Sequence, residues 1–494
     1  VVLKMLPFDD KSELQVVVDM PEDTPMEQTQ RVLTSMGRYL EDHQAVANWQ
    51  AYAGTASPIN FNGLVRQYYL RDAPYQGDLQ INLRDAGRQR PSHAIAGDLR
   101  EPLTAIGRRY GAAVKIVEVP PGPPVLSPVV AEVYGPTAES RAEQADRLAE
   151  RMRASDGLVD VDTSVEAPTD AWRVVVDRKR AATLGVAQAQ VVDALATTLG
   201  ERHVAYLRDP QAKYAVPIRV ILDEGDRAQQ AALRSLTVRN RDGKPIRLAQ
   251  VARIERHDWP GVIRHKDLLP VTYVTADMAG AVDSPLYGMF DVVGQLADAE
   301  DAPPQHYISQ PEWPDQAAIK WDGEWQITYE TFRDMGIAYA VGVVAIFLLL
   351  VAQFGSYRVP LIVMAPIPLT LIGIMPGHAL LAKEFTATSM IGMIALAGII
   401  VRNSILLVVF IRDRVGEGQS LEQAVVLASA VRLKPIALTA LSAMLGALFI
   451  LQDPIFNGLA ISLVFGLAMS TLLTVLVVPL AYYAFVGQRG ESSR

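Results

Sequence analysis

The hydrophobic and polar positions divide the chain at about residue 334. Before that point, apolar and charged residues alternate over short stretches interrupted by proline, and beyond it long apolar runs dominate. A run of about 20 apolar residues covers the hydrocarbon core of a bilayer. Five such runs predict five membrane-spanning helices, at Gly336–Ala352, Val359–Ala382, Phe385–Ile411, Leu433–Leu451 and Leu459–Val486.

Basic residues flank these runs unevenly. If the first span runs inward, the outer flanks carry only Lys383, together with Glu384 and Asp453. The inner flanks carry seven basic residues, Arg358, Arg412, Arg414, Arg432, Lys434, Arg489 and Arg494. Because basic residues concentrate on the cytoplasmic side, we expect the region before residue 334 on the opposite side. In a Gram-negative cell that side is the periplasm.

Small residues and prolines mark where these spans pack and bend. Pro366, Pro368 and Pro376 are expected to interrupt the backbone hydrogen bonds of the second span. Ser420–Gln423 has the form of a capping box and predicts a short amphipathic cytoplasmic helix that ends before Arg432. Pairs of small residues four apart predict close helix contacts, at Gly373 and Gly377, Ser442 and Gly446, and Gly466 and Ser470.

The region before the membrane spans shows two split βαβ units. In the first, a strand is predicted at Glu13–Met20, and Thr24 is predicted to cap a helix at its N-terminus, with Glu27 completing the capping box. One face of this helix is apolar, with Val32, Leu33, Met36 and Leu40. The remaining elements are strands at Ala47–Ala53 and Asp78–Leu83, a helix at Ile95–Tyr110 and a strand at Ala113–Val119.

The second unit is interrupted by an inserted module. The unit itself comprises strands at Pro128–Val133, Leu158–Val161 and Val271–Val274, a helix after Thr137, and a helix opened by Ser284 and Pro285 that buries Met289, Phe290, Val293 and Leu296. The module, about Ala171 to His257, has a strand at Trp172–Val176, a helix with Val191, Val192, Leu195 and Leu199, and a hairpin that turns on Asp242 and Gly243.

Composition excludes several classes of function. The net charge of -8 and pI near 5.5 argue against a nucleic-acid partner, because no basic face can neutralise phosphates. The chain has no cysteine, so it can form no disulfide and no thiolate metal site. Its seven histidines show no spacing typical of metal ligands, and no nucleophile, Walker or GxGxxG motif occurs. We therefore expect no enzyme activity, no metal site and no cofactor, and an ion gradient as the energy source.

Arg402 lies in the middle of the third apolar run, which contains no acidic residue. At 1.5 Å per residue, it lies roughly 13 Å from the end of that run at Ile411. A charge at such depth usually faces a bundle interior and a partner. The other apolar runs also lack acidic residues. We therefore expect the counter-charge to come from further membrane helices and this chain to be one half of a larger bundle.

Several separate motifs resemble one known family. The run Ala397–Val408 (AGIIVRNSILLV) and the element Arg432–Thr439 (RLKPIALT) resemble signatures of the resistance-nodulation-division (RND) efflux transporters. Leu6–Asp9 is similar to the start of a periplasmic domain of that family, and Val174–Asp177 with Leu184–Val186 is similar to the opening of its docking domain. The chain is similar to the C-terminal half of an acriflavine-resistance type inner-membrane permease, whose twelve membrane helices form two repeats.

The resemblance implies an architecture of an all-α transmembrane bundle and an α+β periplasmic region. The bundle holds five helices here, and the periplasmic region contains split βαβ porter subdomains and an inserted docking module. The predicted divisions are a first porter subdomain at 1–122, a second at 123–170 and 258–334, the docking module at 171–257, the five helices at 335–486 and a cytoplasmic tail at 487–494.

The resemblance also implies a proton relay. Arg402 takes the position of the relay's basic residue, usually lysine, Thr439 that of its hydroxyl and Asn403 that of a polar neighbour. The relay aspartates of the family belong to the other half. Arginine holds its proton more firmly than lysine, so it can steer the relay but scarcely donate a proton. Val409 stands where many relatives have an acidic residue. The alternative for Arg402 is a structural ion pair, and Arg432 and Lys434 are most simply anchors at the cytoplasmic surface.

An aromatic set in the first subdomain surrounds a loop rich in glycine and proline. The family forms its substrate cleft in this region, and aromatic side chains suit promiscuous apolar ligands. For each residue, core packing or anchoring of a turn is an equally good explanation. The set comprises Trp49, Tyr52, Phe61, Tyr68 and Tyr69, with Tyr75 nearby.

Three functions remain open on the sequence. The first is a proton-driven exporter of amphiphilic small molecules, acting as a homotrimer in the bacterial inner membrane with a periplasmic adaptor, an outer-membrane channel and an N-terminal half of seven helices. The second is an exporter of monovalent metal, copper or silver. The third is a non-transporting docking fragment of a split gene. The residues leave the substrate open.

Overall fold

The computed structural model describes residues 1–84, 88, 90–119, 122, 124–167, 169–200, 202–223, 225, 229–259, 261–280, 282–300, 302–313 and 315–491, of which 487–491 are described by their backbone only. The tail predicted at 487–494, with the flanking Arg489 and Arg494, lies partly outside these residues. The chain forms two compact units, one of Val1–Val165 with Ile263–Arg494 and one of Glu166–Val262.

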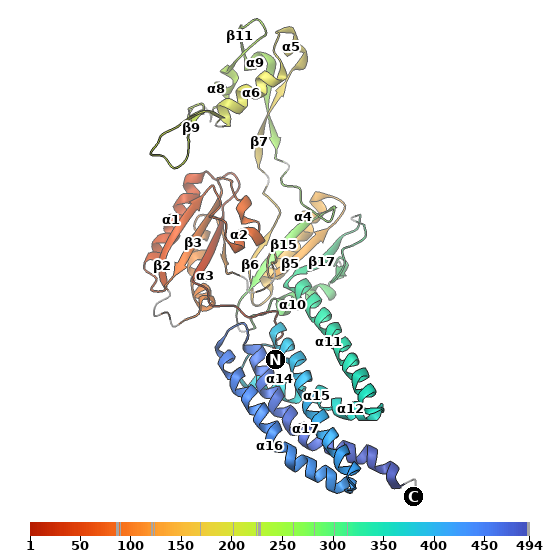
Figure 1. The fold of residues 1–494 in the computed structure, drawn as a ribbon. Coiled ribbons are helices and arrows are strands. Elements are labelled where there is room, and N and C mark those ends of the chain that lie inside the picture. The colour runs from red at the N-terminus through yellow and green to blue at the C-terminus, as the bar shows by residue number, and fades with distance from the viewer. Residues whose placement is uncertain are drawn as a thin grey trace. The chain divides into compact units, whose positions relative to one another are not determined.

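The first α+β subdomain is a four-stranded antiparallel sheet covered by two helices (Figure 1, red to orange). Its elements are β1 (Glu13–Asp19), α1 (Met26–Glu41), β2 (Val46–Ala53), α2 (Phe61–Val65), η1 (Tyr68–Leu70), β3 (Gln76–Leu83), α3 (Ser92–Arg108) and β4 (Ala113–Val117). The strand order is β2-β3-β1-β4, and Val16 of β1 pairs with Leu79 of β3 and with Ile116 of β4. Val16, Leu79 and Ile116 lie on the face of the sheet that is buried beneath α1 and α3.

The second α+β subdomain repeats this strand order. Its elements are β5 (Val129–Tyr134), α4 (Ala138–Ala154), β6 (Leu158–Thr163), β13 (His265–Lys266), β14 (Leu269–Pro270), β15 (Thr272–Met278), α10 (Pro285–Ala297), β16 (Gln305–His306) and β17 (Ala318–Gly323). The order β17-β5-β15-β6 corresponds to β4-β1-β3-β2 of the first sheet, with β16 added at the edge. The inserted unit lies between β6 and β15 in sequence, where the first subdomain has the short connection from β2 to β3.

The inserted unit, Glu166–Val262, has a small core of its own around Val191, Leu248 and Val251. Its elements are β7 (Asp170–Val176), α5 (Arg178–Thr183), α6 (Gln188–Leu199), β8 (Arg202–Leu207), β9 (Val216–Val220), α8 (Gln230–Ser235), β10 (Thr237–Arg239), β11 (Pro245–Arg247), α9 (Leu248–Val251) and β12 (Ala252–Asp258). The hairpin predicted at Asp242 and Gly243 is confirmed as β10–β11, with Gly243 at a positive φ of 78°.

The five predicted membrane spans correspond to five helical segments that are long and apolar enough to cross a membrane. They comprise α11 (Glu324–Phe354), then α12 (Arg358–Met364), α13 (Pro366–Leu369) and α14 (Leu371–Leu380) as one broken span, then α15 (Ala387–Gly416), α16 (Leu421–Leu448) followed by η2 (Phe449–Gln452), and α17 (Asn457–Glu491). The second span is interrupted on either side of Pro366 and Pro368, as expected from prolines that donate no hydrogen bond.

Small residues set the helix contacts at two of the three predicted places. A side-chain carbon on Gly373 would lie 2.6 Å from the carbonyl oxygen of Phe465, and one on Gly466 would lie 2.4 Å from Leu396. The prediction for the fourth span is wrong among the described residues, because Gly446 has no atom within 4 Å of such a carbon. Helix α16 presents that face outward.

Three local predictions are also wrong. Helix α1 begins at Met26 after Pro25 and has no side-chain cap, so Thr24 does not cap it. On α10 the buried face comprises Leu286, Met289, Val292 and Leu296, whereas Phe290 is 46 % exposed and Val293 only partly buried. The short cytoplasmic helix does begin after the cap Ser420, but it continues through Arg432 and Pro435 into the fourth span as one helix, α16.

Candidate functional site

Helix α15 carries Arg402 on an exposed stripe of the bundle. Thr386 caps this helix by accepting a hydrogen bond from Ser389, and α15 then runs for 30 residues. Its exposed positions recur every three or four residues, at Ile391, Ala395, Gly398, Arg402 and Leu406. Within the described residues, the Arg402 side chain has no hydrogen bond or ion pair. A charge on this apolar stripe requires a partner outside the five helices.

The two other residues predicted for the relay lie differently. Asn403 is 5 % exposed and packs inside the bundle. Thr439 is exposed on α16, and its hydroxyl donates a hydrogen bond of 2.8 Å to the carbonyl oxygen of Pro435. Of the three predicted relay residues, Arg402 and Thr439 therefore face outward from the five helices. The structure gives no contact between these two side chains.

The aromatic residues predicted for a substrate cleft do not form one cluster. The Trp49 ring packs against Gly37 in the core of the first subdomain. The Tyr52 hydroxyl donates to Gln50, and Tyr68 lies beside Arg71. Phe61 and Tyr69 are 43 % and 46 % exposed. Core packing therefore accounts for Trp49, and the other four lie at or near the surface in this chain.

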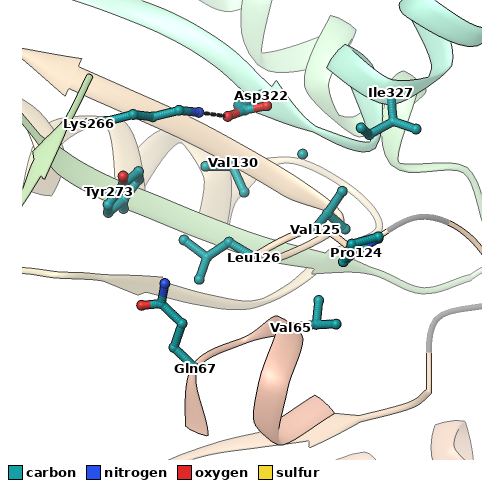
Figure 2. A pocket seen from close by; sticks show the side chains of 11 residues that line it. Val65, Gln67, Pro124, Val125, Leu126, Val130, Lys266, Tyr273, Asp322 and Ile327 are labelled. Carbon is teal, nitrogen blue, oxygen red and sulfur yellow. Dashed lines mark hydrogen bonds and ion pairs between the residues drawn. The ribbon is translucent and has the colours of Figure 1, made fainter. Parts of the chain in front are cut away.

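A cavity of about 320 Å³ does lie beside the same loop (Figure 2). It is lined by Val65, Gln67, Pro124, Val125, Leu126, Val130, Lys266, Tyr273, Asp322, Gly323 and Ile327. Val65 and Gln67 of the first subdomain face the open side of the second sheet, and none of the five predicted aromatic residues lines the space. Its lining, which combines apolar side chains with polar ones and one ion pair, suits a small amphiphilic molecule.

The charged wall of the cavity belongs to a buried polar cluster on the second sheet. Glu132 is completely buried, and its carboxylate contacts Lys266, accepts from the Tyr134 hydroxyl at 2.7 Å and lies 3.5 Å from Lys320. Burial raises the pKa of Glu132. Burial alone would also raise the pKa of Asp322, but hydrogen bonds from Glu132 and Lys266 lower it to about 2. Asp322 is therefore the stronger acid of these two carboxyl groups.

Several ion pairs join the two α+β subdomains in the described part of the chain, and we call three of them the charged seam. They are Arg66–Asp277 at 3.6 Å, Arg100–Asp160 and Lys115–Asp162. Every basic partner belongs to the first subdomain and every acidic partner to the second. Burial alone would lower the pKa of Lys115, but the charge of Asp162 raises it above its ordinary value. Separation of the seam would expose an acidic wall opposite a basic one.

Asp160 has an unusual backbone conformation within the seam. It has a positive φ of 53° although it lies in strand β6, and non-glycine residues rarely adopt that region. Its carboxylate accepts the backbone N–H of Ile116 in β4 at 3.1 Å. The edge strands β4 and β6 therefore meet through a side chain and not through a continuous backbone ladder. Such a contact can separate without disrupting either sheet.

Sequence reasoning missed both the cavity and the seam. The acidic members Asp160 and Asp162 alternate with Val159 and Val161 in one strand, and Lys115 interrupts an apolar strand. This alternation placed the charges on one face of an edge strand, but nothing in the sequence paired them. Within the described residues, no three histidine, aspartate or glutamate side chains gather as a metal site would require.

Comparison with known proteins supplies the relatives of this chain. Residues 2–486 match the AcrB/AcrD/AcrF family. The chain is 26 % identical over 357 residues to the swarming motility protein SwrC of Bacillus subtilis, covering 71 % of this chain and 32 % of SwrC. It is 27 % identical over 371 residues to the cobalt-zinc-cadmium resistance protein CzcA of Cupriavidus metallidurans, covering 72 % of this chain and 33 % of CzcA.

Solved structures share the fold. Two crystal forms of a heavy metal efflux pump align over 98 % of this chain with a TM-score of 0.76, at 19 % and 20 % sequence identity. The alignment covers 48 % of each of those chains. The chain thus spans about half the length of the solved proteins, and its aligned part covers about a third of each curated relative.

Proposed function

Because the chain belongs to the AcrB/AcrD/AcrF family of RND permeases, which are secondary active transporters and not enzymes, we propose that it forms part of a proton-driven exporter of amphiphilic compounds. One observation carries this proposal. Arg402 lies on an exposed apolar stripe of α15 with no partner among the described residues. Such a charge is costly in a membrane unless further helices supply an acidic group.

The relay proposed here uses Arg402 as a fixed cation. Such a cation favours the charged form of a nearby carboxylate, and the attraction between the two is lost when the carboxylate takes up a proton. The carboxylates would come from the other half of the transporter. Thr439 faces outward with a hydroxyl that can exchange its bond to Pro435 for a bond to that half. Asn403 packs within the five helices and supports the position of α15.

The test is replacement of Arg402 in the complete transporter. Arg402→Ala should abolish proton-driven export while leaving the amount of protein in the membrane unchanged, because removal of a charge favours insertion by about 2.5 kcal/mol or more. Arg402→Lys should retain part of the activity, since it preserves the charge. Export of dye from vesicles with a pH gradient measures both variants. Export at the wild-type rate by Arg402→Ala would contradict the role of Arg402 in the relay. Export by this half alone would contradict the need for a partner half.

The cavity between the two α+β subdomains supports an amphiphilic substrate. Its lining combines apolar side chains such as Val125, Leu126 and Ile327 with the Lys266–Asp322 pair. At about 320 Å³ it lies at the lower end of the range for small-molecule sites. Opening of the charged seam would enlarge it. Phe61, Tyr68 and Tyr69 belong to the adjoining loop and are proposed to contact the substrate after such opening.

Export of heavy-metal cations is the second candidate. The relative named for cobalt, zinc and cadmium resistance and the heavy metal efflux pump structures favour it. The acidic side of the charged seam, Asp160, Asp162 and Asp277, would attract a cation. Vesicles loaded in parallel with a dye, with zinc or with copper distinguish the two candidates. Transport of metal without dye would replace the amphiphile proposal.

The inserted unit supports an assembly of several chains. Strands β8 and β9 are exposed along their whole length and carry apolar side chains such as Tyr206 and Ile218, and the exposed Tyr214 lies in the segment between them. Such a hairpin suits insertion into a neighbouring copy. We propose a homotrimer that works with a periplasmic adaptor and an outer-membrane channel, located in the inner membrane with a cytoplasmic C-terminus. Cross-linking from Tyr214→Cys should capture a second copy, and its failure would favour a monomeric docking fragment.

A further inference from the structure

The first eleven residues, Val1–Lys11, form a segment that contacts the membrane bundle and both α+β subdomains. We call this segment the strap. It lacks regular secondary structure except for a single bridge between Leu3 and Phe385. Its contacts form three groups, one for each part of the unit.

The first group connects the strap to the start of helix α15. Phe385 donates its backbone N–H to Val2 at 2.8 Å, and Lys4 donates to the Phe385 carbonyl oxygen at 3.1 Å. Ala387, the first residue of α15, donates to the Met5 carbonyl oxygen at 3.1 Å. A helix leaves its first N–H groups without partners inside the helix, and the strap satisfies one of them. Displacement of this end of α15 therefore acts directly on the strap.

The second group connects the strap to the second subdomain. Ser284 donates its hydroxyl to the Leu3 carbonyl oxygen at 2.7 Å, and Leu3 donates its N–H to the Tyr287 hydroxyl at 3.2 Å. The ammonium group of Lys4 lies 2.8 Å from the Asp283 carboxylate. Lys4 is 3 % exposed, so this ion pair is shielded from water and from salt.

The third group connects the strap to the first subdomain. His93 of α3 lies 3.2 Å from Asp283 through Nε2 and 2.8 Å from Glu118 through Nδ1. The Phe8 ring stacks on the His93 ring with centroids 4.3 Å apart, and Lys4 lies 4.4 Å from the Phe8 centroid. Asp283 thus bridges Lys4 of the strap and His93 of the first subdomain.

A second connection leads from the bundle to the second subdomain through α11, which touches α15 by side chains near the start of that helix, such as Met390. Strand β17 ends at Gly323, and α11 begins at the next residue. Only 6 % of the most apolar 18-residue stretch of α11 is buried. The strap, in contrast, pairs with the first residue of the helix that carries Arg402.

We propose that the strap couples α15 to both α+β subdomains, with Lys4 as the positioning residue of that coupling. This inference rests on the proposed proton-driven function. When the charge around Arg402 changes, α15 shifts along or about its axis, and the hydrogen bonds of the strap carry the shift to Lys4. The Lys4–Asp283–His93 contacts then pass it to the second subdomain and the first subdomain together.

The experiment uses two reporter positions in the complete transporter, made free of other cysteines. Val415→Cys labels the far end of α15, and Glu101→Cys labels an exposed position on α3. Each carries an environment-sensitive fluorophore, and the response to a step in pH is recorded. In the wild type both labels should respond. In Lys4→Met the fluorescence of the α15 label should respond as in the wild type. The response of the α3 label should fall at least about 5-fold, which is the lower end of the factors by which coupled sites typically affect each other.

Lys11→Met is the matched control, because Lys11 is also a strap lysine but forms an exposed pair with Asp9. It should leave both responses unchanged. His93→Gln, which retains the Lys4–Asp283 pair, provides a second variant if Lys4→Met fails to insert, and it should also weaken only the α3 response. Unchanged α3 responses in Lys4→Met or His93→Gln would overturn the coupling role while leaving the transporter proposal intact. Absence of any response in the wild type would overturn the proton-driven function and the strap with it.

Discussion

The α+β subdomains and the membrane bundle differ in whether their charged side chains have partners. In the first subdomain, Arg71 lies 2.7 Å from Asp19 and 3.1 Å from Asp78, which is itself 1 % exposed. In the second, Glu132 is enclosed by Lys266 and Lys320. In the bundle, Arg402 lies on an apolar stripe without a partner among the described residues.

This contrast shows which region is complete within the chain. Buried ion pairs require several hydrogen bonds in good geometry to offset desolvation, and the α+β region supplies them from its own residues. The bundle satisfies its apolar core but leaves outward faces on α11, α15 and α16. Apolar side chains on those faces can contact lipid, whereas Arg402 needs a charged partner. The charge, more than the exposed apolar area, therefore indicates a missing neighbour.

The largest expected effect is disruption of the complete region. Glu132→Ala removes a fully buried carboxylate and leaves Lys266 and Lys320 sharing Asp322 alone. We expect a loss of about 3–5 kcal/mol in the free energy of unfolding of the α+β region, the usual cost of breaking a buried pair. Chemical unfolding followed by tryptophan fluorescence measures it.

A matched change at an exposed pair checks this reasoning. Asp98→Ala breaks the Arg90–Asp98 pair on the surface of the first subdomain. Exposed pairs contribute at most about 1 kcal/mol, so this variant should unfold almost as the wild type does. Equal losses from Glu132→Ala and Asp98→Ala would contradict the distinction between buried and exposed charge in this region.

An intermediate effect is expected inside the bundle, where shape and not charge specifies packing. Gly373→Ala places a carbon 2.6 Å from the Phe465 carbonyl oxygen and 2.7 Å from Met469. Overpacking of this kind typically costs about 1–3 kcal/mol. The matched control is Gly446→Ala, which has open space in this chain. Gly373→Ala should lower the temperature of thermal inactivation in detergent, whereas Gly446→Ala should not. A lower temperature for Gly446→Ala alone would contradict the placement of the close contact at Gly373.

The smallest effect is a dependence on pH at the junction of the strap. Hydrogen bonds to Asp283 and Glu118 raise the pKa of His93 to about 9, from an ordinary value of 6.5. A raised pKa stabilises the folded state fully below pH 6.5, and that contribution is lost as the pH rises through about 9. His93 contacts Asp283, Glu118 and the Phe8 ring, and Lys4 lies behind them, against Asp283 and Phe8.

The melting temperature of the wild type should therefore fall between pH 7 and pH 9.5 by more than that of His93→Gln. Differential scanning calorimetry over this interval records the difference. Parallel pH profiles for the two proteins would show that the His93 proton does not contribute to the junction.

Local pattern predicted most of the elements because each is specified by its own residues. The apolar positions Val32, Leu33, Met36 and Leu40 of α1 are all completely buried, and all five spans were located. Errors occurred where a local signal competed with tertiary packing. The Ser420 cap was correct, but the end of its helix was not, since the helix continues through Pro435. Likewise, Phe290 fits an apolar helix face but packs against Trp325 near the surface.

The sequence by itself determined the division into α+β and membrane regions, the five spans and the need of Arg402 for a partner. These follow from hydrophobic periodicity, length and the cost of a charge in hydrocarbon, which depend on residues close together in the chain. Only the tertiary structure decided which charges meet. Lys115 and Asp162 are 47 residues apart, and Lys4 and Asp283 are 279 residues apart. The seam, the cavity and the strap depend on such long-range contacts, because the order of strands, and not the pattern within them, brings these side chains together.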